Sequence, residues 1–292
     1  DEKHVWALAC RGDTYRQIGK NTEALADLTR AIEMDGSDAS QYAARGVTYR
    51  QMGKNVEALA DLTRAIKLDE SNTLYCAARG ETYRLMGKYA EALADFDRAI
   101  GLNDKYAWAI ASRGQIYRRW GRYTEALADF DRAIGLNDKY AWAIASRGQT
   151  YRLMGRYTEA LADHNRAIEM DSKYAWAFAS RGETCRLMGR YTEALADLDR
   201  AIQLDAKDDW AICNRGRTHR DMGNLQAAIA DLNYATELDP KCDWHQYERA
   251  LVERLSGNGV GFVASARSAI ELANETLLSS PYDWQNVLNL AL

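Results

Sequence analysis

The stretch from Ala107 to Asp138, AWAIASRGQIYRRWGRYTEALADFDRAIGLND, decides the fold. Small and apolar residues recur at helical spacing in each half of it: Ile110, Gly114 and Tyr117 first, then Ala126, Phe130 and Ala133. Between the halves stands Gly121, a residue that tolerates the left-handed backbone needed where a helix ends. The stretch therefore predicts two helices joined by a short turn, with Gly121 in the turn and Thr124 capping the second helix.

This unit recurs along almost the whole chain. An Arg-Gly pair returns every 34 residues, from Arg11-Gly12 to Arg215-Gly216, and Arg249-Ala250 continues the series in a degenerate form. We expect full repeats at 5–38, 39–72, 73–106, 107–140, 141–174, 175–208 and 209–242, a degenerate eighth repeat at 243–276, and at 277–292 a capping helix or the start of a further repeat. The expected fold is an all-α solenoid in which neighbouring repeats share a core.

The repeat resembles the tetratricopeptide-repeat (TPR) consensus, in which a large residue, Gly, Tyr, Ala, Phe and Ala follow one another in this order. The resemblance covers nearly the whole chain, and it implies a right-handed superhelical solenoid of antiparallel helix pairs whose first helices line a concave surface. Two departures stand out. The consensus proline occurs only at Pro240, and an arginine replaces the leucine that usually precedes the glycine.

That arginine forms the first arginine row: Arg11, Arg45, Arg79, Arg113, Arg147, Arg181 and Arg215. An aspartate row matches it on the second helices: Asp27, Asp61, Asp95, Asp129, Asp163, Asp197 and Asp231. Asp129 lies on the stripe that also holds two packing alanines, so it faces the first helix. We expect Arg113 to pair with Asp129, and each equivalent pair likewise, as a structural interaction.

A second arginine row directly follows the packing tyrosine: Arg16, Arg50, Arg84, Arg118, Arg152, Arg186 and Arg220. The resemblance implies that this row faces the concave groove. The candidate partner-binding residues are Arg84, Arg118, Arg152, Arg186, Arg220, Trp108, Trp142, Trp176, Trp210, Gln115, Gln149, Glu183 and Asn214. Small residues, such as Ser112 and Ser146, are expected to form the groove floor. For the tryptophans, packing between repeats and binding of a partner stay open as alternatives.

Composition and the absence of site motifs exclude several function classes. A net charge of −4 disfavours a protein held on nucleic acid or on anionic membrane by bulk charge. Five cysteines without a CxxC pair, and four histidines without a partner at ligand spacing, predict no metal site, no cofactor and no catalytic residue. No apolar run approaches the length of a membrane span, and no signal peptide begins the chain, so we expect a cytoplasmic protein that is not an enzyme.

Three functions remain, in descending order of preference. The first is a scaffold whose concave groove binds an acidic peptide or segment, from a partner protein or from another domain of the same polypeptide. The second is the ligand-sensing domain of a larger bacterial signalling or defence protein, an idea that rests on fold analogy alone. Single-stranded nucleic-acid binding comes last, because arginine and tryptophan stand side by side while the overall charge is acidic.

Overall fold

The computed structural model describes residues 2–279, and the chain divides into two compact units, residues 1–138 (unit 1) and 139–292 (unit 2). The described residues form helices joined by short turns, with no strand among them, so the expected all-α architecture is confirmed. Of the expected terminal segment 277–292, residues 280–292 lie outside the described part.

Each unit is a series of helical hairpins. Unit 1 contains α1 (Glu2–Gln17), α2 (Asn21–Met34), α3 (Ala39–Gln51), α4 (Asn55–Leu68), α5 (Thr73–Leu85), α6 (Tyr89–Leu102), α7 (Ala107–Arg119) and α8 (Tyr123–Leu136). Unit 2 contains α9 (Ala141–Leu153), α10 (Tyr157–Met170), α11 (Ala175–Leu187), α12 (Tyr191–Leu204), α13 (Asp209–Asp221), α14 (Leu225–Leu238), α15 (Asp243–Leu255) and α16 (Gly259–Ser279).

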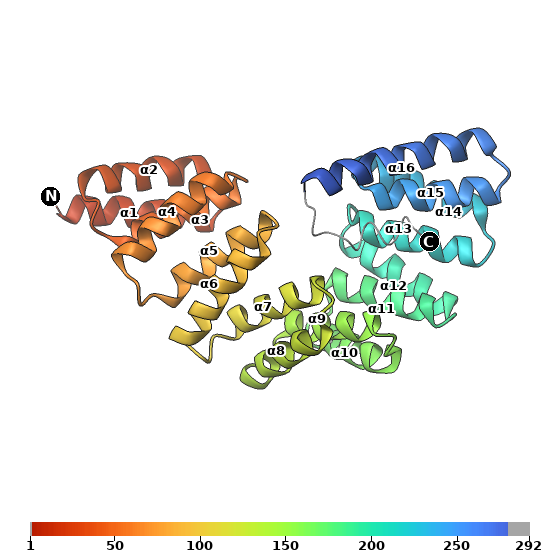
Figure 1. The fold of residues 1–292 in the computed structure, drawn as a ribbon, viewed down its shortest axis with the longest axis horizontal. Helices are drawn as coiled ribbons and strands as arrows, with labels where there is room; N and C mark the ends of the chain where they lie inside the picture. The colour runs from red at the N-terminus through yellow and green to blue at the C-terminus, as the bar shows by residue number, and fades with distance from the viewer. Residues whose placement is uncertain (1, 280–292) are drawn as a thin grey trace. The chain divides into compact units, whose positions relative to one another are not determined.

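Within each unit every helix packs against the next, and hairpins stack in chain order (Figure 1). The odd-numbered helices also contact one another, as in α1 with α3 and α11 with α13. Among the described residues, no two even-numbered helices approach each other in this way. The odd-numbered helices, which carry both arginine rows, therefore form the more closely spaced row of each unit.

Small side chains allow the two helices of a hairpin to approach closely. A Cβ atom added at Gly114 would lie 3.1 Å from Cε1 of Phe130 and 3.3 Å from the carbonyl oxygen of Ala126. Phe130 and Ala126 are both fully buried. The repeated glycine is thus required by helix contact, because a side chain there would push the hairpin apart.

The turns follow the sequence prediction in one respect and correct it in another. Gly121 adopts φ of +71°, and the amide of Arg122 donates to the carbonyl of Tyr117, which closes the first helix as expected. Thr124, however, is not the cap. The helix already begins at Tyr123, the capping place belongs to Arg122, and no side chain accepts a hydrogen bond there. The second helix therefore begins one residue before Thr124, directly after the glycine turn.

The first arginine row pairs with the aspartate row as predicted. Arg113 donates from Nε and Nη2 to the two carboxylate oxygens of Asp129, at 2.8 and 2.6 Å. Its Nη1 binds Asp97 of the preceding hairpin at 2.7 Å. The other six members make the same two bonds within their own hairpin. Since Asp129 is only 5% exposed, the row is a structural feature that holds each hairpin together and, in several repeats, ties it to the one before.

The hairpin of α15 and α16 departs from this plan, as its sequence suggests. Ser265 stands at the position that is aspartate in the other repeats. Nε of Arg249 donates to its hydroxyl at 2.9 Å. Ser265 in turn donates to Glu253 at 2.6 Å. Gly257, with φ of +78°, marks the turn between the two helices, and α16 begins two residues later at Gly259.

Candidate partner-binding surface

In unit 1 the second arginine row binds acceptors on its own helices. Arg16 Nη2 lies 2.7 Å from Asp13, and Arg84 donates twice to Glu81, each time at 2.7 Å. Both acids stand one helical turn before their arginine, at the spacing that favours such pairs. The neutral Gln115 takes this place in α7, where its Oε1 accepts from Arg118 at 3.0 and 2.7 Å.

Arg50 is the exception in this row. The place of Asp13 or Glu81 is taken by Val47, which offers no acceptor. The guanidinium of Arg50 makes a single hydrogen bond, 3.3 Å long, to the carbonyl oxygen of Ala78. Among residues 2–279, no carboxylate lies within ion-pair distance of it.

The surroundings of Arg50 disfavour its positive charge. Burial lowers the pKa of this guanidinium; Glu81 opposes that shift, and the neighbouring Arg84 and Arg16 add to it. The Arg50 side chain is half-buried, so water solvates its positive charge only in part. An anion bound here would accept a hydrogen bond from Arg50, whose guanidinium pairs with no carboxylate in the described part of unit 1.

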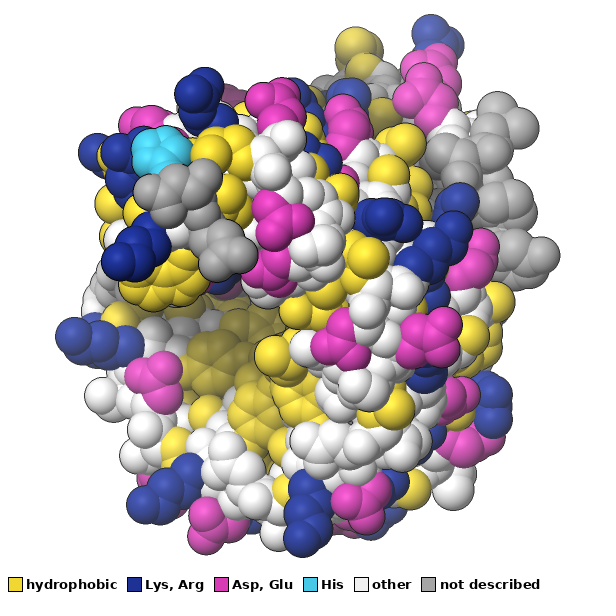
Figure 2. Space-filling view, turned by 90° about the vertical axis from the view of Figure 1, so that its left-hand side faces the viewer, with side chains coloured by type: hydrophobic (Ala, Val, Ile, Leu, Met, Phe, Trp, Pro, Cys, Tyr) yellow, Lys and Arg dark blue, Asp and Glu magenta, His cyan; other side chains and the backbone are white. Residues whose placement is uncertain are grey.

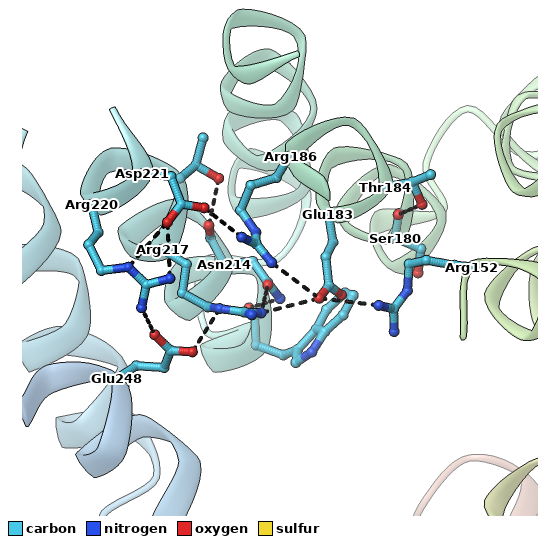
Figure 3. Close-up of polar contacts among 12 residues, drawn as sticks. Arg152, Ser180, Glu183, Thr184, Arg186, Asn214, Arg217, Arg220, Asp221 and Glu248 are labelled. Atoms are coloured by element: carbon cyan, nitrogen blue, oxygen red, sulfur yellow. Dashed lines mark hydrogen bonds and ion pairs between the residues drawn. The ribbon is translucent and has the colours of Figure 1, made fainter. Parts of the chain in front are cut away.

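In unit 2 the arginines of the second arginine row bind acids on neighbouring hairpins. Glu183 of α11 lies at the centre of one cluster, where its Oε1 is 3.4 Å from Arg152 Nη1 and 3.1 Å from Arg217 Nη1 (Figure 3). Arg186 Nη2 is 4.0 Å away on the same helix as Glu183. One carboxylate thus joins α9, α11 and α13.

Two further acids extend these contacts to α15. Asp221 Oδ2 accepts from Arg186 at 2.6 Å, and its Oδ1 from Arg220 at 3.0 Å. Glu248 pairs with Arg220 through one oxygen, and its other oxygen lies 2.9 Å from Nε of Arg217 (Figure 3). We name the seven residues of these two clusters the ion network: Arg152, Glu183, Arg186, Arg217, Arg220, Asp221 and Glu248.

The two glutamates of the ion network are buried. The side chain of Glu248 is 2% exposed and that of Glu183 is 7% exposed. Burial alone would raise the pKa of Glu183, but Arg152, Arg217 and Arg186 outweigh it, so the pKa lies below its ordinary value. Burial lowers the pKa of Arg217, but Glu248 and Glu183 outweigh it and raise this pKa above its usual value. Glu183 and Arg217 are therefore each stabilised by more than one opposite charge, which is the condition for burying ions at all.

The expected groove floor is covered. Ser146 is fully buried, Ser112 is 3% exposed, and Asn214 is 1% exposed. Asn214 Nδ2 donates to the carbonyl of Trp210, and its Oδ1 accepts from Arg217 at 2.9 Å. Each of these residues lies on an odd-numbered helix, and odd-numbered helices of successive hairpins contact one another within each unit. These buried residues therefore do not form the exposed groove floor that the sequence suggested.

The other candidate residues divide between buried and half-buried places. Gln149 is 8% exposed and accepts from Arg152 at 3.2 Å. Arg186 is 7% exposed and belongs to the ion network. Arg84 and Arg118 are half-buried.

Tryptophans near the starts of odd-numbered helices form the tryptophan row: Trp6, Trp108, Trp142, Trp176, Trp210 and Trp244. In several repeats this row packs against the preceding hairpin. Trp108 meets Phe96 edge-on, with 5.8 Å between ring centroids. Trp210 packs on the buried cluster around Leu198, and Trp244 on the cluster around Leu232. These contacts support the packing alternative for Trp108, Trp210 and Trp244.

Trp142, Trp176 and Trp6 have other surroundings. Trp142 and Trp176 lie against Tyr140 and Tyr174, with centroids 5.7 and 5.9 Å apart. Trp6 is 70% exposed and borders a cavity of about 460 Å³ beside Met34. The row as a whole thus has no single environment.

The described residues also bear on metal binding and on membrane insertion. Within residues 2–279, no group of three or more His, Cys, Asp or Glu side chains is arranged to hold a metal ion. None of the helices in that range is long and apolar enough to cross a membrane. On the face shown in Figure 2, basic and acidic side chains are interspersed, and no large patch of one sign appears there.

Family models match the repeats along the chain. A model described as TPR repeat matches residues 12–53, and two described as tetratricopeptide repeat match 40–72 with 211–242 and 77–141 with 146–209. The chain belongs to the tetratricopeptide-repeat family. Among curated proteins, none matches the sequence.

Solved TPR structures share this fold at low sequence identity. A tetratricopeptide repeat protein from Parabacteroides merdae aligns with a TM-score of 0.72 at 20% identity, over 86% of this chain and 99% of its own. The Cut9-Hcn1 hetero-tetramer of the APC/C aligns with 0.73 at 15% identity, over 96% of this chain and 55% of the other. The pilF protein of Pseudomonas aeruginosa aligns with 0.60 at 16%, over 73% and 96%. At such identities the likeness establishes the fold of the TPR chain and not its partner.

Two acids of the ion network were missed at the sequence level. Glu248 stands where Ser112, Ser146 and Asn214 stand in earlier repeats, so a charge replaces a small or neutral residue. Asp221 likewise occupies a place that is leucine in α9 and α11. These departures from the repeat were the available signal.

Proposed function

We propose that this TPR chain is a protein-interaction scaffold that binds an extended acidic segment along its odd-numbered helices, with Arg50 as the central anion-binding residue. The segment belongs to a partner protein or to another domain of the same polypeptide. Arg16 and Arg84 flank Arg50 in the row, and each is paired with an acid on its own helix. The half-buried guanidinium of Arg50, which pairs with no carboxylate in the described residues, is the observation that carries the proposal.

The spacing of the row suits an extended chain. Packed helices lie about 8–10 Å apart, and an extended peptide advances about 3.3 Å per residue, so every third side chain would meet one arginine. The odd-numbered helices are also the more closely spaced row, as on the inner side of a curved stack of hairpins. An acidic side chain at every third position would therefore meet Arg16, Arg50 and Arg84 in turn.

The ion network makes unit 2 a poor binding surface for an acidic segment. Arg186 and Arg220 already hold Asp221 and Glu248, and Arg152 holds Glu183. A ligand carboxylate would have to compete with these internal acids, which are held in place at no cost in binding entropy. We therefore assign the binding surface to unit 1, where Arg16 and Arg84 use acceptors on their own helices and Arg50 uses none of that kind.

A titration with a hexaglutamate peptide tests the proposal. We expect binding that weakens with added salt, and no binding of a hexaglutamine peptide. Arg50→Gln should weaken hexaglutamate binding about tenfold or more, because a hydrogen bond to a charged group contributes about 1.5–3 kcal/mol. Arg30→Gln, an exposed arginine on α2, removes the same charge away from the row and should bind as the wild type does.

Two results would overturn the proposal. One is hexaglutamate binding that Arg50→Gln and Arg30→Gln reduce equally, since the effect would then be one of net charge. The other is retention of single-stranded RNA at low salt together with no binding of hexaglutamate, which would favour the nucleic-acid alternative. Arg152→Glu is unsuitable for this test, because it would place a second acid beside Glu183 and disturb folding.

A further inference from the structure

A cavity of about 380 Å³ lies in unit 2 between α10, α11 and α12. Its walls include Leu161, Arg181, Arg190 and Glu193, and Cys185 also borders it. It shares no residue with the ion network or with the second arginine row.

The cavity lies where other repeats carry a tyrosine ring. Cys185 occupies the place that Tyr117 holds two repeats earlier. In that repeat the guanidinium of Arg122 lies 4.6 Å from the centre of the Tyr117 ring, and that of Arg113 lies 5.8 Å from it. Two arginines thus flank one aromatic ring, an arrangement stabilised by cation–π attraction.

The walls around Cys185 are nearly those around Tyr117. Arg181, Arg190, Leu161, Glu193, Ala196 and Asp197 correspond to Arg113, Arg122, Leu93, Glu125, Ala128 and Asp129. One wall residue differs, since Asn165 replaces Asp97. The repeat has therefore kept the surroundings of the ring and replaced the ring itself with a small thiol.

Both arginines are held in place without the ring. Arg181 donates to Asp197 at 2.7 and 2.6 Å and to Asn165 at 2.7 Å, and it also lies over Phe178 at 5.5 Å. Arg190 Nε donates to Glu193 at 2.7 Å. The walls are pre-organised, so an incoming ring would not have to order them.

We propose that this cavity binds the aromatic ring of a tyrosine or phenylalanine side chain from a partner protein, which lies between Arg181 and Arg190 as Tyr117 lies between Arg113 and Arg122. The chain itself supplies the argument for this occupant, because it fills the equivalent space with its own tyrosine. Ring faces carry negative potential, which complements the two guanidinium groups. The site goes beyond the proposed acidic-segment surface, and neither depends on the other.

Cys185 serves as the floor of this site. Its thiol is 3% exposed, and burial raises its pKa, so the reactive thiolate form is disfavoured. Cys185 therefore contributes to the site through its small volume, which leaves room for a ring.

Titrations followed by amide chemical shifts on the whole chain test the inference. The probes are p-cresol, which is the free tyrosine side chain, and N-acetyl-L-tyrosinamide, which adds a peptide backbone. We expect both to shift the amides of Arg181, Cys185 and Arg190 in a saturable manner. Cys185→Tyr should abolish these shifts because it fills the cavity, whereas Cys185→Ser should keep them.

A second variant works in the opposite direction and does not depend on the folding of Cys185→Tyr. Tyr117→Cys should open an equivalent cavity in α7, so p-cresol should then also shift the amides of Arg113 and Arg122. The inference is overturned if p-cresol produces no saturable shift at Cys185, or if Cys185→Tyr binds it as well as the wild type. Binding of p-cresol with exclusion of N-acetyl-L-tyrosinamide would overturn the assignment to a protein side chain.

Discussion

The second arginine row has one sequence pattern but two environments. In unit 1, Arg16 and Arg84 pair within their own helices, and Arg50 makes only a carbonyl contact. In unit 2, Arg152, Arg186 and Arg220 pair with acids of neighbouring helices. An arginine that pairs across hairpins links them, whereas one without an internal acid keeps a donor that no carboxylate of the described residues uses. In the proposed function, the same residue at the same repeat position therefore serves stability in unit 2 and binding in unit 1.

The largest expected effect concerns Glu248 in unit 2. Glu248→Ala leaves Arg217 and Arg220 without this acid in a buried place, and it should cost about 3–5 kcal/mol of the free energy of unfolding. The comparison in unit 1 is Glu81→Ala, at another repeat position, which breaks an i,i+3 pair with partial exposure and should cost about 1 kcal/mol or less. Denaturant unfolding measures both, and equal losses would contradict the distinction between the units.

The first arginine row should not distinguish the units. Arg113 in unit 1 and Arg215 in unit 2 each bind an aspartate of their own hairpin twice and an aspartate of the preceding hairpin once. Alanine at either place should cost about 2–4 kcal/mol, somewhat below the value for a fully buried pair, because about a fifth or more of each arginine is exposed. A near-wild-type melting temperature in both variants would refute the structural role of this row.

A second difference between the units lies in the core, where His164 of unit 2 replaces Phe130 of unit 1. His164 is fully buried, and neither ring nitrogen has a hydrogen-bond partner among the described residues. His164→Phe should therefore stabilise the chain by about 1–3 kcal/mol, because an unsatisfied polar group is removed. A Cβ atom added at Gly148 would lie 2.9 Å from Cε1 of the His164 imidazole, and one added at Gly114 would lie similarly close to Cε1 of Phe130. The space beside Gly148 therefore accepts a phenyl ring.

His164 also predicts a pH dependence. Burial, assisted by Arg152 and Arg181 and opposed by Glu183, lowers its pKa to about 3, against 6.5 for an exposed histidine. Below pH 6.5 the unfolded chain binds a proton that the folded chain does not, so stability falls as the pH decreases toward 3. Unfolding measured at pH 7 and pH 4.5 should show a smaller loss in His164→Phe than in the wild type. An identical loss in both would exclude His164 as a source of acid sensitivity.

Much of this account was predictable from the sequence, for a definite reason. The Arg113–Asp129 pair follows from two rows with one spacing inside a single hairpin, and hairpin geometry alone decides it. The pairs of Arg152 with Glu183 and of Arg220 with Glu248 join different hairpins, so they depend on how hairpins stack, which the helical period does not specify. For the same reason the sequence could not show that Ser146 and Asn214 are covered by neighbouring helices.

The central claim is that Arg50 binds while its counterpart Arg220 stabilises. The most direct test applies the same substitution to both, Arg50→Gln and Arg220→Gln, and follows hexaglutamate affinity and melting temperature in parallel. The account predicts weakened binding with an unchanged melting temperature for Arg50→Gln, and a lowered melting temperature with retained binding below the transition for Arg220→Gln. Undiminished hexaglutamate binding by Arg50→Gln would contradict it.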